Sequence, residues 1–258
     1  MLEGKVAVVT GSGRGIGMGI AIKLSEKGSK VAVNDKDEAA VEEVVQLINK
    51  KGGTAIGVVA DISQKSDANR LMDSTVEEFG RLDILVNNAG EFQGAFLEDM
   101  TEAQWDNVLN VDLKGSFLCT QAAAKYMRRG KYGRVINISS PDAFIGEVGM
   151  ANYIAAKAGL FGLTVSVVHE FSRWVKEEGC NMTCNCLIVG YGRTKLAEEA
   201  FPKDISDRYA SEIPLGRPID PENDAGNAAA FLASERASYL TGAKMSVTGG
   251  LYACTTAY

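Results

Sequence analysis

A tyrosine and a lysine four residues apart, Tyr153 and Lys157 in the stretch ANYIAAKAG, are the first residues in this chain whose types and spacing suggest chemistry. On a helix the two side chains share one face, so the lysine ammonium could act on the tyrosine phenol. A phenol has an ordinary pKa near ~10, and a nearby positive charge favours its ionised form. The pair could therefore exchange a proton with a reacting oxygen. The same spacing recurs at Tyr191 and Lys195, where nearby glycines disfavour a regular helix.

A glycine-rich turn, TGSGRGIG, follows the first predicted strand and opens the next predicted helix. Gly11, Gly15 and Gly17 have no Cβ, which lets backbone amides and the helix N-terminus approach a pyrophosphate. Taken alone, such a turn is also consistent with a tight chain reversal. Asp35 favours the nucleotide interpretation, because it ends the second predicted strand, near the separation at which an acidic residue meets an adenosine ribose.

Asp35 also bears on the choice of cofactor. A carboxylate accepts hydrogen bonds from a ribose 2′-OH but repels a 2′-phosphate, so NAD is favoured over NADP. Arg14 and Lys36 are cations that could neutralise such a phosphate, and NADP is the alternative for this reason.

The elements that must position these residues alternate between short β-branched runs and helix-length amphipathic segments. This alternation predicts an α/β fold, a doubly wound (Rossmann-type) parallel sheet with helices on both faces. Helices are expected at Glu38–Lys51, Ser66–Phe79 and Glu102–Arg129. Strands are expected at Lys5–Thr10, Lys30–Asp35, Ala55–Asp61, Asp83–Gly90, Gly133–Ser140 and Met182–Val189, and a late strand, AKMSVTGG, closes the sheet.

Length and composition indicate one folded domain over residues 1–258, with a substrate segment at about 190–213. The net charge of −6 argues against a nucleic-acid partner, because phosphate backbones require clustered positive charge. No apolar run is long enough to predict a membrane span, and the N-terminus MLEGKVAVVTG does not resemble a signal peptide. A cytoplasmic location is therefore expected.

Five cysteines include Cys180, Cys184 and Cys186, which superficially suggest a metal cluster. A structural zinc site usually combines two pairs of ligands, and the spacing of these cysteines supplies no second pair. His169 is the only histidine of the sequence. No metal site is predicted, and the cysteines are expected to be reduced and mostly buried.

Six motifs occur in the order typical of the short-chain dehydrogenase/reductase family, which this chain resembles over essentially its full length. Near the end, PLGRPIDPEN and FLASERASYLTG extend the resemblance. The chain is similar to 3-oxoacyl-carrier-protein reductases and to related sugar and alcohol dehydrogenases. The motifs are TGSGRGIG, Asp61, NNAG at 87–90, Asn110 in LNVDLKGSF, Ser140 and YIAAK at 153–157.

The resemblance implies roles for individual residues. Tyr153 would be the general acid/base, assisted by Lys157, and Ser140 would hydrogen-bond the reacting oxygen, with Ser139 left to packing or backbone contacts. Asn110 would bend its helix and hold a water that links Lys157 to solvent. The residues expected to bind the cofactor are Gly11, Arg14, Gly15, Ile16, Gly17, Asp35, Asp61, Ile62, Asn87, Ala89, Gly90, Tyr153, Lys157, Gly190 and Thr194.

The chain departs from the family pattern at three places. Val189-Gly190 replaces the usual Pro-Gly, which removes a fixed φ and puts the position of Thr194 in doubt. Thr248 replaces the usual aspartate before the final Gly-Gly, and Pro221-Glu222-Asn223 replaces Pro-Glu-Glu. The last two departures are expected to affect packing or assembly.

The predicted function is therefore an NAD(P)-dependent oxidoreductase that interconverts a secondary alcohol and a ketone. The alternative is a catalytically silent dinucleotide sensor on the same fold. Specificity is expected from loops at 91–96, 141–150 and 191–213, where Glu91, Asp142 and Glu147 could bind a polyhydroxylated substrate. In the same loops Phe92, Phe96, Phe144 and Met150 could surround an apolar substrate, and Arg193 could meet an anion.

An acyl-carrier-protein substrate would require a basic landing surface, for which Arg128, Arg129 and Lys131 are the compact candidate. The family resemblance further implies a homotetramer, in which helices at Glu102–Arg129 and Ala151–Val175 pack between subunits.

Overall fold

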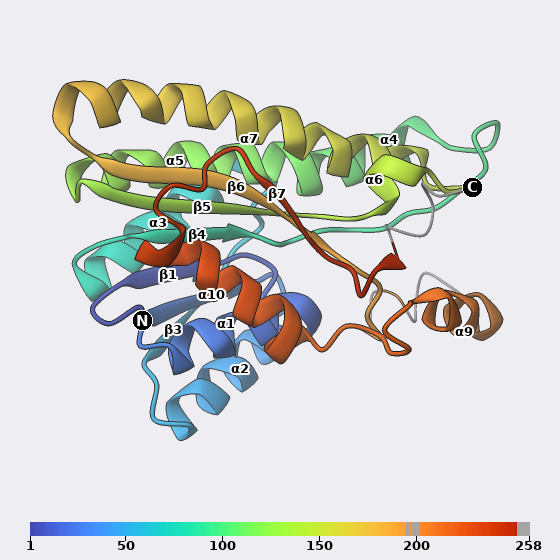
Figure 1. The fold of residues 1–258 in the computed structure, drawn as a ribbon, viewed down its shortest axis with the longest axis horizontal. Helices are drawn as coiled ribbons and strands as arrows, with labels where there is room; N and C mark the ends of the chain where they lie inside the picture. The colour runs from blue at the N-terminus through green and yellow to red at the C-terminus, as the bar shows by residue number, and fades with distance from the viewer. Residues whose placement is uncertain (195–196, 198–201, 252–258) are drawn as a thin grey trace.

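Seven parallel strands form one sheet in the order β3-β2-β1-β4-β5-β6-β7 in the computed structural model, which describes residues 1–194, 197 and 202–251. This arrangement confirms the predicted doubly wound fold (Figure 1). The strands are β1 (Val6–Val9), β2 (Lys30–Asp35), β3 (Ala55–Val59), β4 (Ile84–Asn87), β5 (Tyr132–Ser139), β6 (Asn181–Val189) and β7 (Lys244–Val247).

Helices cover both faces of the sheet because both faces of its strands are apolar. In β1, Ala7 and Val9 pack into one core and Val8 packs into the other. The first core is closed by α1 (Gly15–Glu26), α2 (Glu38–Lys50) and α10 (Asn227–Ala233), and the second by α3 (Lys65–Phe79), α5 (Ser116–Arg129) and α7 (Ala151–Glu178). The remaining helical elements are α4 (Glu102–Leu109), η1 (Asn110–Gly115), α6 (Asp142–Ile145), α9 (Lys203–Glu212), η2 (Pro221–Gly226) and η3 (Glu235–Ala237).

The helix expected over Glu102–Arg129 is not one regular helix. A π-helical turn, η1, separates α4 from α5, and both flanking residues keep helical backbone angles. Such turns insert a wider i→i+5 loop into a helix and are frequent at functional sites. The two other predicted helices agree with α2 and α3 to within one residue at each end.

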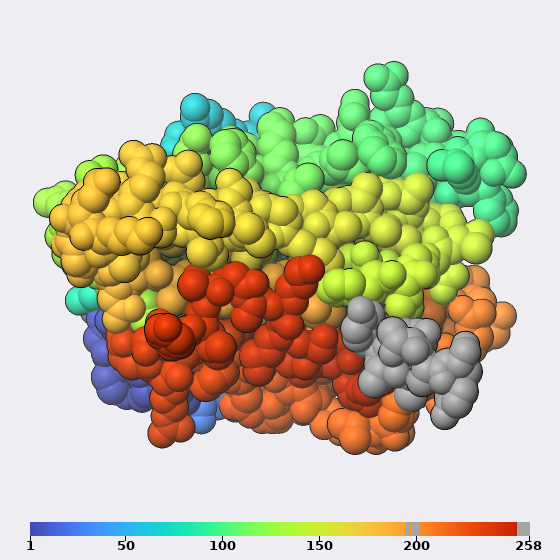
Figure 2. Space-filling model, turned by 45° about the horizontal axis from the view of Figure 1, so that its top comes forward, coloured from blue at the N-terminus to red at the C-terminus, as the bar shows by residue number. Residues whose placement is uncertain are grey.

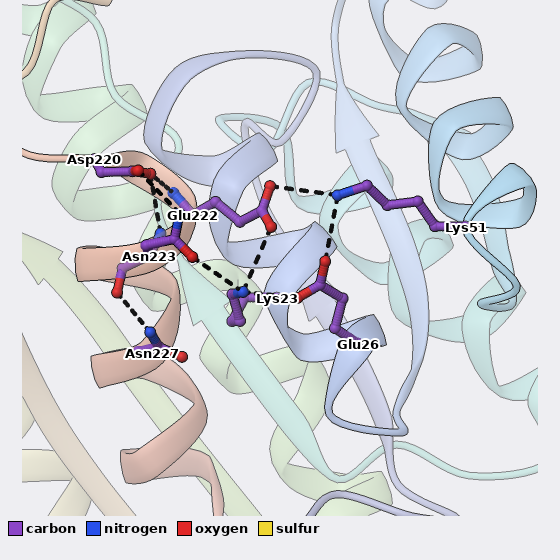
Figure 3. A network of polar contacts seen from close by, with 7 residues as sticks. All are labelled: Lys23, Glu26, Lys51, Asp220, Glu222, Asn223 and Asn227. Carbon is purple, nitrogen blue, oxygen red and sulfur yellow. Dashed lines mark hydrogen bonds and ion pairs between the residues drawn. The ribbon is translucent and has the colours of Figure 1, made fainter.

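The segment Pro221-Glu222-Asn223 packs against α1. This departure from the family pattern therefore has a packing role, as expected. Lys23 of α1 is nearly buried, and its Nζ lies 2.7 Å from Glu26 Oε2 and 3.4 Å from Glu222 Oε1. Lys51 joins the same two carboxylates at 3.3 and 3.5 Å (Figure 3). Asp220 caps η2 by accepting hydrogen bonds from the Glu222 and Asn223 amides. The network therefore fixes the helix that follows the glycine-rich turn.

The long helix α7 runs across one face of the molecule (Figure 2, yellow). Its length and composition alone would allow it to cross a membrane. In this fold, however, its inner side packs on β5 and β6 through residues such as Leu160, Val167 and Phe171. We therefore interpret α7 as a core helix of the α/β domain.

Candidate active site

A cleft of about 610 Å³ opens at the carboxyl ends of the strands, which is where ligands bind in open α/β sheets. It is bounded by the glycine-rich turn after β1, the ends of β2 to β6, and the start of α7. Most of the predicted site residues line it, namely Gly11, Arg14, Gly15, Ile16, Asp35, Asp61, Ile62, Ala89, Gly90, Ser140, Tyr153, Lys157, Gly190 and Thr194.

The glycine-rich turn has the shape of an anion cradle. Gly11 and Gly15 have φ values of +59° and +56°, a backbone region that glycine adopts at little cost. A Cβ on Gly11 would come within 2.6 Å of Ala89 Cα, so the glycine permits close contact between the β1 and β4 loops. The N-cap residue of α1, Arg14, makes no side-chain capping hydrogen bond, and no acidic residue lies in the first turn. The amides at this end are therefore available to a phosphate group, and the turn fits a dinucleotide.

Asp35 ends β2 at the edge of the cleft. Its Oδ1 accepts a hydrogen bond from the Lys36 amide at 2.8 Å, and its Oδ2 accepts a longer one from the Gly13 amide at 3.3 Å. Arg14 forms an ion pair with Asp37 at the start of α2. One of the two cations that could neutralise a 2′-phosphate is therefore already paired, whereas Asp35 remains turned toward the cleft.

Two residues predicted to contact the cofactor do not line the cleft. Gly17 packs inside the turn, where a Cβ would come within 2.4 Å of Asn88 Nδ2. Asn87 is buried and donates hydrogen bonds to Thr120 Oγ1 at 3.0 Å and Asn137 Oδ1 at 2.8 Å. The neighbouring Asn88 lines the cleft instead and ties β4 to the turn by donating to the Thr10 and Gly11 carbonyls. The two asparagines of NNAG differ in this way because strand alternation turns adjacent side chains to opposite sides, and the cofactor contact of Asn87 stays a prediction.

Ser140, Tyr153 and Lys157 converge in the cleft. Ser140 follows β5, and the other two residues share one face of the first turns of α7, with Lys157 Nζ 5.4 Å from the Tyr153 ring centre. Ser139 also borders the cleft, but its hydroxyl donates a hydrogen bond to the Lys157 carbonyl at 2.9 Å, the kind of backbone contact that was expected of it. Phe92 packs edge-on against the Tyr153 ring, with centres 5.8 Å apart.

Asp112, which the sequence reasoning missed, lies beside Lys157. Its Oδ2 is 3.1 Å from Lys157 Nζ, its Oδ1 accepts a hydrogen bond from the Glu91 amide at 2.8 Å, and its side chain is 0% exposed. Asn110, which was expected near Lys157, instead accepts a hydrogen bond from Lys114 Nζ at 3.2 Å and does not line the cleft. Asp112, and not Asn110, therefore contacts Lys157 in this structure, and the role expected of Asn110 stays a prediction. The π-helical turn places the residue two positions later against the lysine.

The pKa of Tyr153 is raised rather than lowered by the side chains around it. Burial raises it most, and the positive charge of Lys157 opposes this effect. The negative charges of Asp112 and Asp142 raise it further. Burial tends to lower the pKa of Lys157, but the charges of Asp112 and Tyr153 outweigh that effect, so its pKa is raised and the ammonium is retained. Lys157 therefore favours the phenolate, as expected, but within this chain it does not offset the effect of burial on the pKa of Tyr153.

An acidic side chain, Asp142, lines the cleft next to Ser140. Asp142 Oδ2 accepts a hydrogen bond from the Ser140 hydroxyl at 2.7 Å, and burial raises the pKa of this carboxyl. Nearby, Glu147 accepts a hydrogen bond from the Tyr209 hydroxyl at 2.8 Å and lies 3.6 Å from an Arg208 nitrogen.

The loop after β6 completes the cleft despite lacking the usual proline. Gly190 approaches the Thr248 backbone so closely that a Cβ would come within 2.7 Å of Thr248 Cα. Thr194 then lies over the turn, with its Cγ2 3.3 Å from where a Cβ of Gly15 would stand. The Tyr191 ring also lines the cleft, whereas Lys195, the other half of the second tyrosine and lysine pair, is outside the described residues.

The cysteines do not gather into a site within the described ranges. Cys119, Cys180, Cys184 and Cys186 are free and buried. Across residues 1–194, 197 and 202–251, no group of three or more histidine, cysteine or acidic side chains is arranged to hold a metal ion.

Comparison with known proteins extends these observations over nearly the whole chain. A family model described as enoyl-(acyl carrier protein) reductase matches residues 11–252. A 3-oxoacyl-(acyl-carrier-protein) reductase of Staphylococcus aureus is 38% identical over 96% of this chain and 98% of its own length. A (3R)-3-hydroxyacyl-CoA dehydrogenase of Mus musculus is 38% identical over 97% of both chains. A crystal structure described as a short-chain alcohol dehydrogenase from Sinorhizobium meliloti 1021 is 35% identical, covers 98% of both chains and superposes with a TM-score of 0.90.

Proposed function

Because this chain belongs to the short-chain dehydrogenase/reductase family of oxidoreductases, we propose that it interconverts a secondary alcohol and a ketone with a nicotinamide dinucleotide. The convergence of Ser140, Tyr153 and Lys157 beside the glycine-rich cradle in one cleft carries this proposal. A dinucleotide held at the cradle would extend along the carboxyl ends of the strands toward these three side chains.

The chemistry requires a hydride acceptor and a base. A nicotinamide dinucleotide bound in the cleft would supply the hydride acceptor for oxidation of the alcohol and the hydride donor for reduction of the ketone. Tyr153 takes the hydroxyl proton as the carbonyl forms and gives it back during reduction. Ser140 lies beside the phenol and orients the reacting oxygen. Lys157 stabilises the phenolate by its charge.

NAD is the proposed cofactor, with NADP as the alternative. The Asp35 carboxylate at the end of β2 would accept hydrogen bonds from a ribose 2′-OH and repel a 2′-phosphate. The ion pair between Arg14 and Asp37 supports the same choice, because it engages a cation that a 2′-phosphate would otherwise attract.

The proposed substrate is a small alcohol or ketone, although the two curated relatives described above are named for acyl thioesters. The compact basic candidate for an acyl-carrier partner lies far from the cleft. Arg128 and Lys131 precede β5, at the opposite end of the strand from Ser140, and both form ion pairs with Glu178. The charges of Arg128 and Lys131 therefore lie away from the cleft and are paired with Glu178.

A homotetramer is part of the same proposal. The outer sides of α5 and α7 leave large apolar residues in solvent, among them Phe117, Val165 and Val175. These faces would be covered if the two helices packed between subunits. Sedimentation of a monomer at micromolar concentration would contradict the assembly without bearing on the reaction.

The reaction is tested by incubating the protein with NAD or NADP and a panel of secondary alcohols, and by following absorbance of the reduced cofactor. Ketones with the reduced cofactors test the reverse direction. Turnover of at least one alcohol and ketone pair is the expected result. Cofactor binding without turnover across the panel would contradict the proposal and favour the dinucleotide sensor.

A further inference from the structure

The hydroxyl of Ser140 already donates a hydrogen bond within the protein. A serine hydroxyl carries one hydrogen, and here that hydrogen points to Asp142 Oδ2 at 2.7 Å. Ser140 therefore presents only oxygen lone pairs toward the cleft. An alcohol can donate its own hydrogen to such an oxygen, but a ketone needs a donor to polarise its carbonyl.

Asp142 accepts the only hydrogen of the Ser140 hydroxyl and so keeps it from a ketone oxygen. It lines the cleft two residues after Ser140, at the start of the short helix α6. Among the described residues it forms no ion pair, whereas the neighbouring Glu147 has both Tyr209 and Arg208 as partners. A carboxylate that is largely removed from water gains much from an additional hydrogen-bond donor. The structure thus leaves Asp142 ready to accept a donor from a ligand.

We propose, building on the function proposed above, that Asp142 selects substrates carrying a hydrogen-bond donor, a hydroxyl or an ammonium group, on the carbon next to the reacting carbon. Asp142 Oδ2 is one hydrogen bond away from Ser140 Oγ, and the reacting oxygen lies one hydrogen bond away on the other side. The oxygens of a vicinal diol are separated by about one hydrogen-bond length, so the second donor reaches the carboxylate while the first oxygen stays on Ser140 and Tyr153.

The adjacent donor also changes what Ser140 can do. Once the substrate donor satisfies Asp142, the serine hydrogen is free to turn toward the reacting oxygen and polarise the ketone. An α-hydroxy ketone would therefore be reduced better than a simple ketone of the same size. A carboxylate at the same place on the substrate would be repelled by Asp142.

A second side chain in the cleft supports a polar substrate. The Tyr191 hydroxyl is closed to solvent and has no hydrogen-bond partner in the ranges that the structure describes. Its ring lines the same cleft as Asp142. A buried hydroxyl without a partner is costly, and a further hydroxyl of the substrate would satisfy it.

The test compares butane-2,3-diol, 3-aminobutan-2-ol and butan-2-ol, with 3-hydroxybutyrate as the anionic probe. Each is assayed for kcat/KM in wild type, in Asp142→Asn, and in the exposed control Asp99→Asn. The quantity compared is the ratio of kcat/KM for the diol or amino alcohol to that for butan-2-ol. This ratio is independent of the fraction of active protein, so a partly misfolded variant does not mislead.

We expect wild type and Asp99→Asn to prefer a donor-bearing substrate over butan-2-ol by roughly tenfold or more, and Asp142→Asn to lose most of this preference. A larger gain for the amino alcohol would assign the donor to an ammonium group, and a larger gain for the diol to a hydroxyl. Turnover of butan-2-ol with no such preference, or a preference unchanged in Asp142→Asn, would overturn the inference but leave the proposed function standing. Absence of turnover with every alcohol and both cofactors would overturn the proposed function itself.

Discussion

Lys157 Nζ lies 3.1 Å from Asp112 Oδ2, and both side chains are closed to solvent at the base of the cleft. The carboxylate keeps the buried lysine charged, yet its own negative charge opposes ionisation of Tyr153. The pair therefore holds a cation beside the phenol while cancelling part of the effect of that cation. A buried ion pair of this kind contributes little net stability, but its charges shift the pKa of a neighbouring group such as the Tyr153 phenol.

Replacing the carboxylate by its neutral isostere tests this relationship. Asp112→Asn removes a charge that raises the pKa of Tyr153 and also a charge that raises the pKa of Lys157. While the Lys157 ammonium keeps its proton, the phenolate should form at lower pH. Oxidation of the alcohol needs the phenolate as base, and its rate rises as the phenol loses its proton. The rising limb of the profile of kcat/KM against pH should therefore move to lower pH in the variant.

The matched control for this experiment is Asp106→Asn, the same substitution at an exposed position of α4. Its profile should coincide with that of wild type. A limb that stayed in place in Asp112→Asn would show that Asp112 does not influence the phenol. A limb that moved to higher pH would contradict the prediction and show that the main effect of Asp112 is to keep Lys157 charged. A loss of stability alone, expected at about 3 kcal/mol or more when a buried charge loses its partner, would change amplitudes but not the position of the limb.

Removal of the phenol hydroxyl should abolish most proton transfer without removing the cofactor site. We expect Tyr153→Phe to lower kcat by roughly 10²- to 10⁴-fold, the range for loss of a positioned acid or base. Binding of the reduced cofactor, followed by its fluorescence, should persist. Tyr126→Phe is the control, because that hydroxyl donates to Asp73 on the surface, away from the cleft. Full activity in Tyr153→Phe would remove the tyrosine from the mechanism.

Asp35, the last residue of β2, should decide between NAD and NADP. Wild type is expected to use NAD in preference to NADP, and Asp35→Ser should raise the ratio of kcat/KM for NADP to that for NAD by roughly tenfold or more, because the repulsion of the 2′-phosphate is removed. Asp37→Asn retains a capping residue but releases Arg14, and a smaller rise is expected. A wild-type preference for NADP would contradict the assignment of Asp35.

The sequence predicted the sheet, most of its helices and the shared face of Tyr153 and Lys157 because each rests on a regular period, whereas Ser140 came from the family resemblance. Apolar strand runs fixed the layers, and the spacing of four residues fixed the shared face of Tyr153 and Lys157. The sequence could not decide between Asn110 and Asp112. In a regular helix these two residues are about 200° apart, so only one can face Lys157. The π-helical turn determines which of the two residues faces Lys157, and no local sequence propensity predicts such a turn.

Contacts that depend on single side-chain directions were also beyond prediction. Asp142 was recognised as a polar loop residue, but its hydrogen bond with Ser140 depends on the short helix α6 turning back beside β5. Likewise, the network around Lys23 joins residues about 200 positions apart, which spacing within one element cannot indicate. Such pairings follow from the tertiary fold, after the elements themselves have been placed.

The close contact between α1 and η2 provides a stability prediction that is independent of the active site. A Cβ on Gly19 would come within 2.4 Å of the Pro221 carbonyl carbon and 2.6 Å of the Glu222 nitrogen, and both are backbone atoms that cannot rotate aside. Gly19→Ala should therefore separate the two elements and cost about 1–3 kcal/mol of unfolding free energy. Gly162→Ala is the matched control, because it lies in α7 with no atom within 4 Å of the added Cβ. Alanine there should stabilise the protein by about 0.5–1 kcal/mol, since it favours the helix. Urea unfolding measures both values, and a Gly19→Ala variant as stable as Gly162→Ala would show that η2 yields easily and does not fix α1.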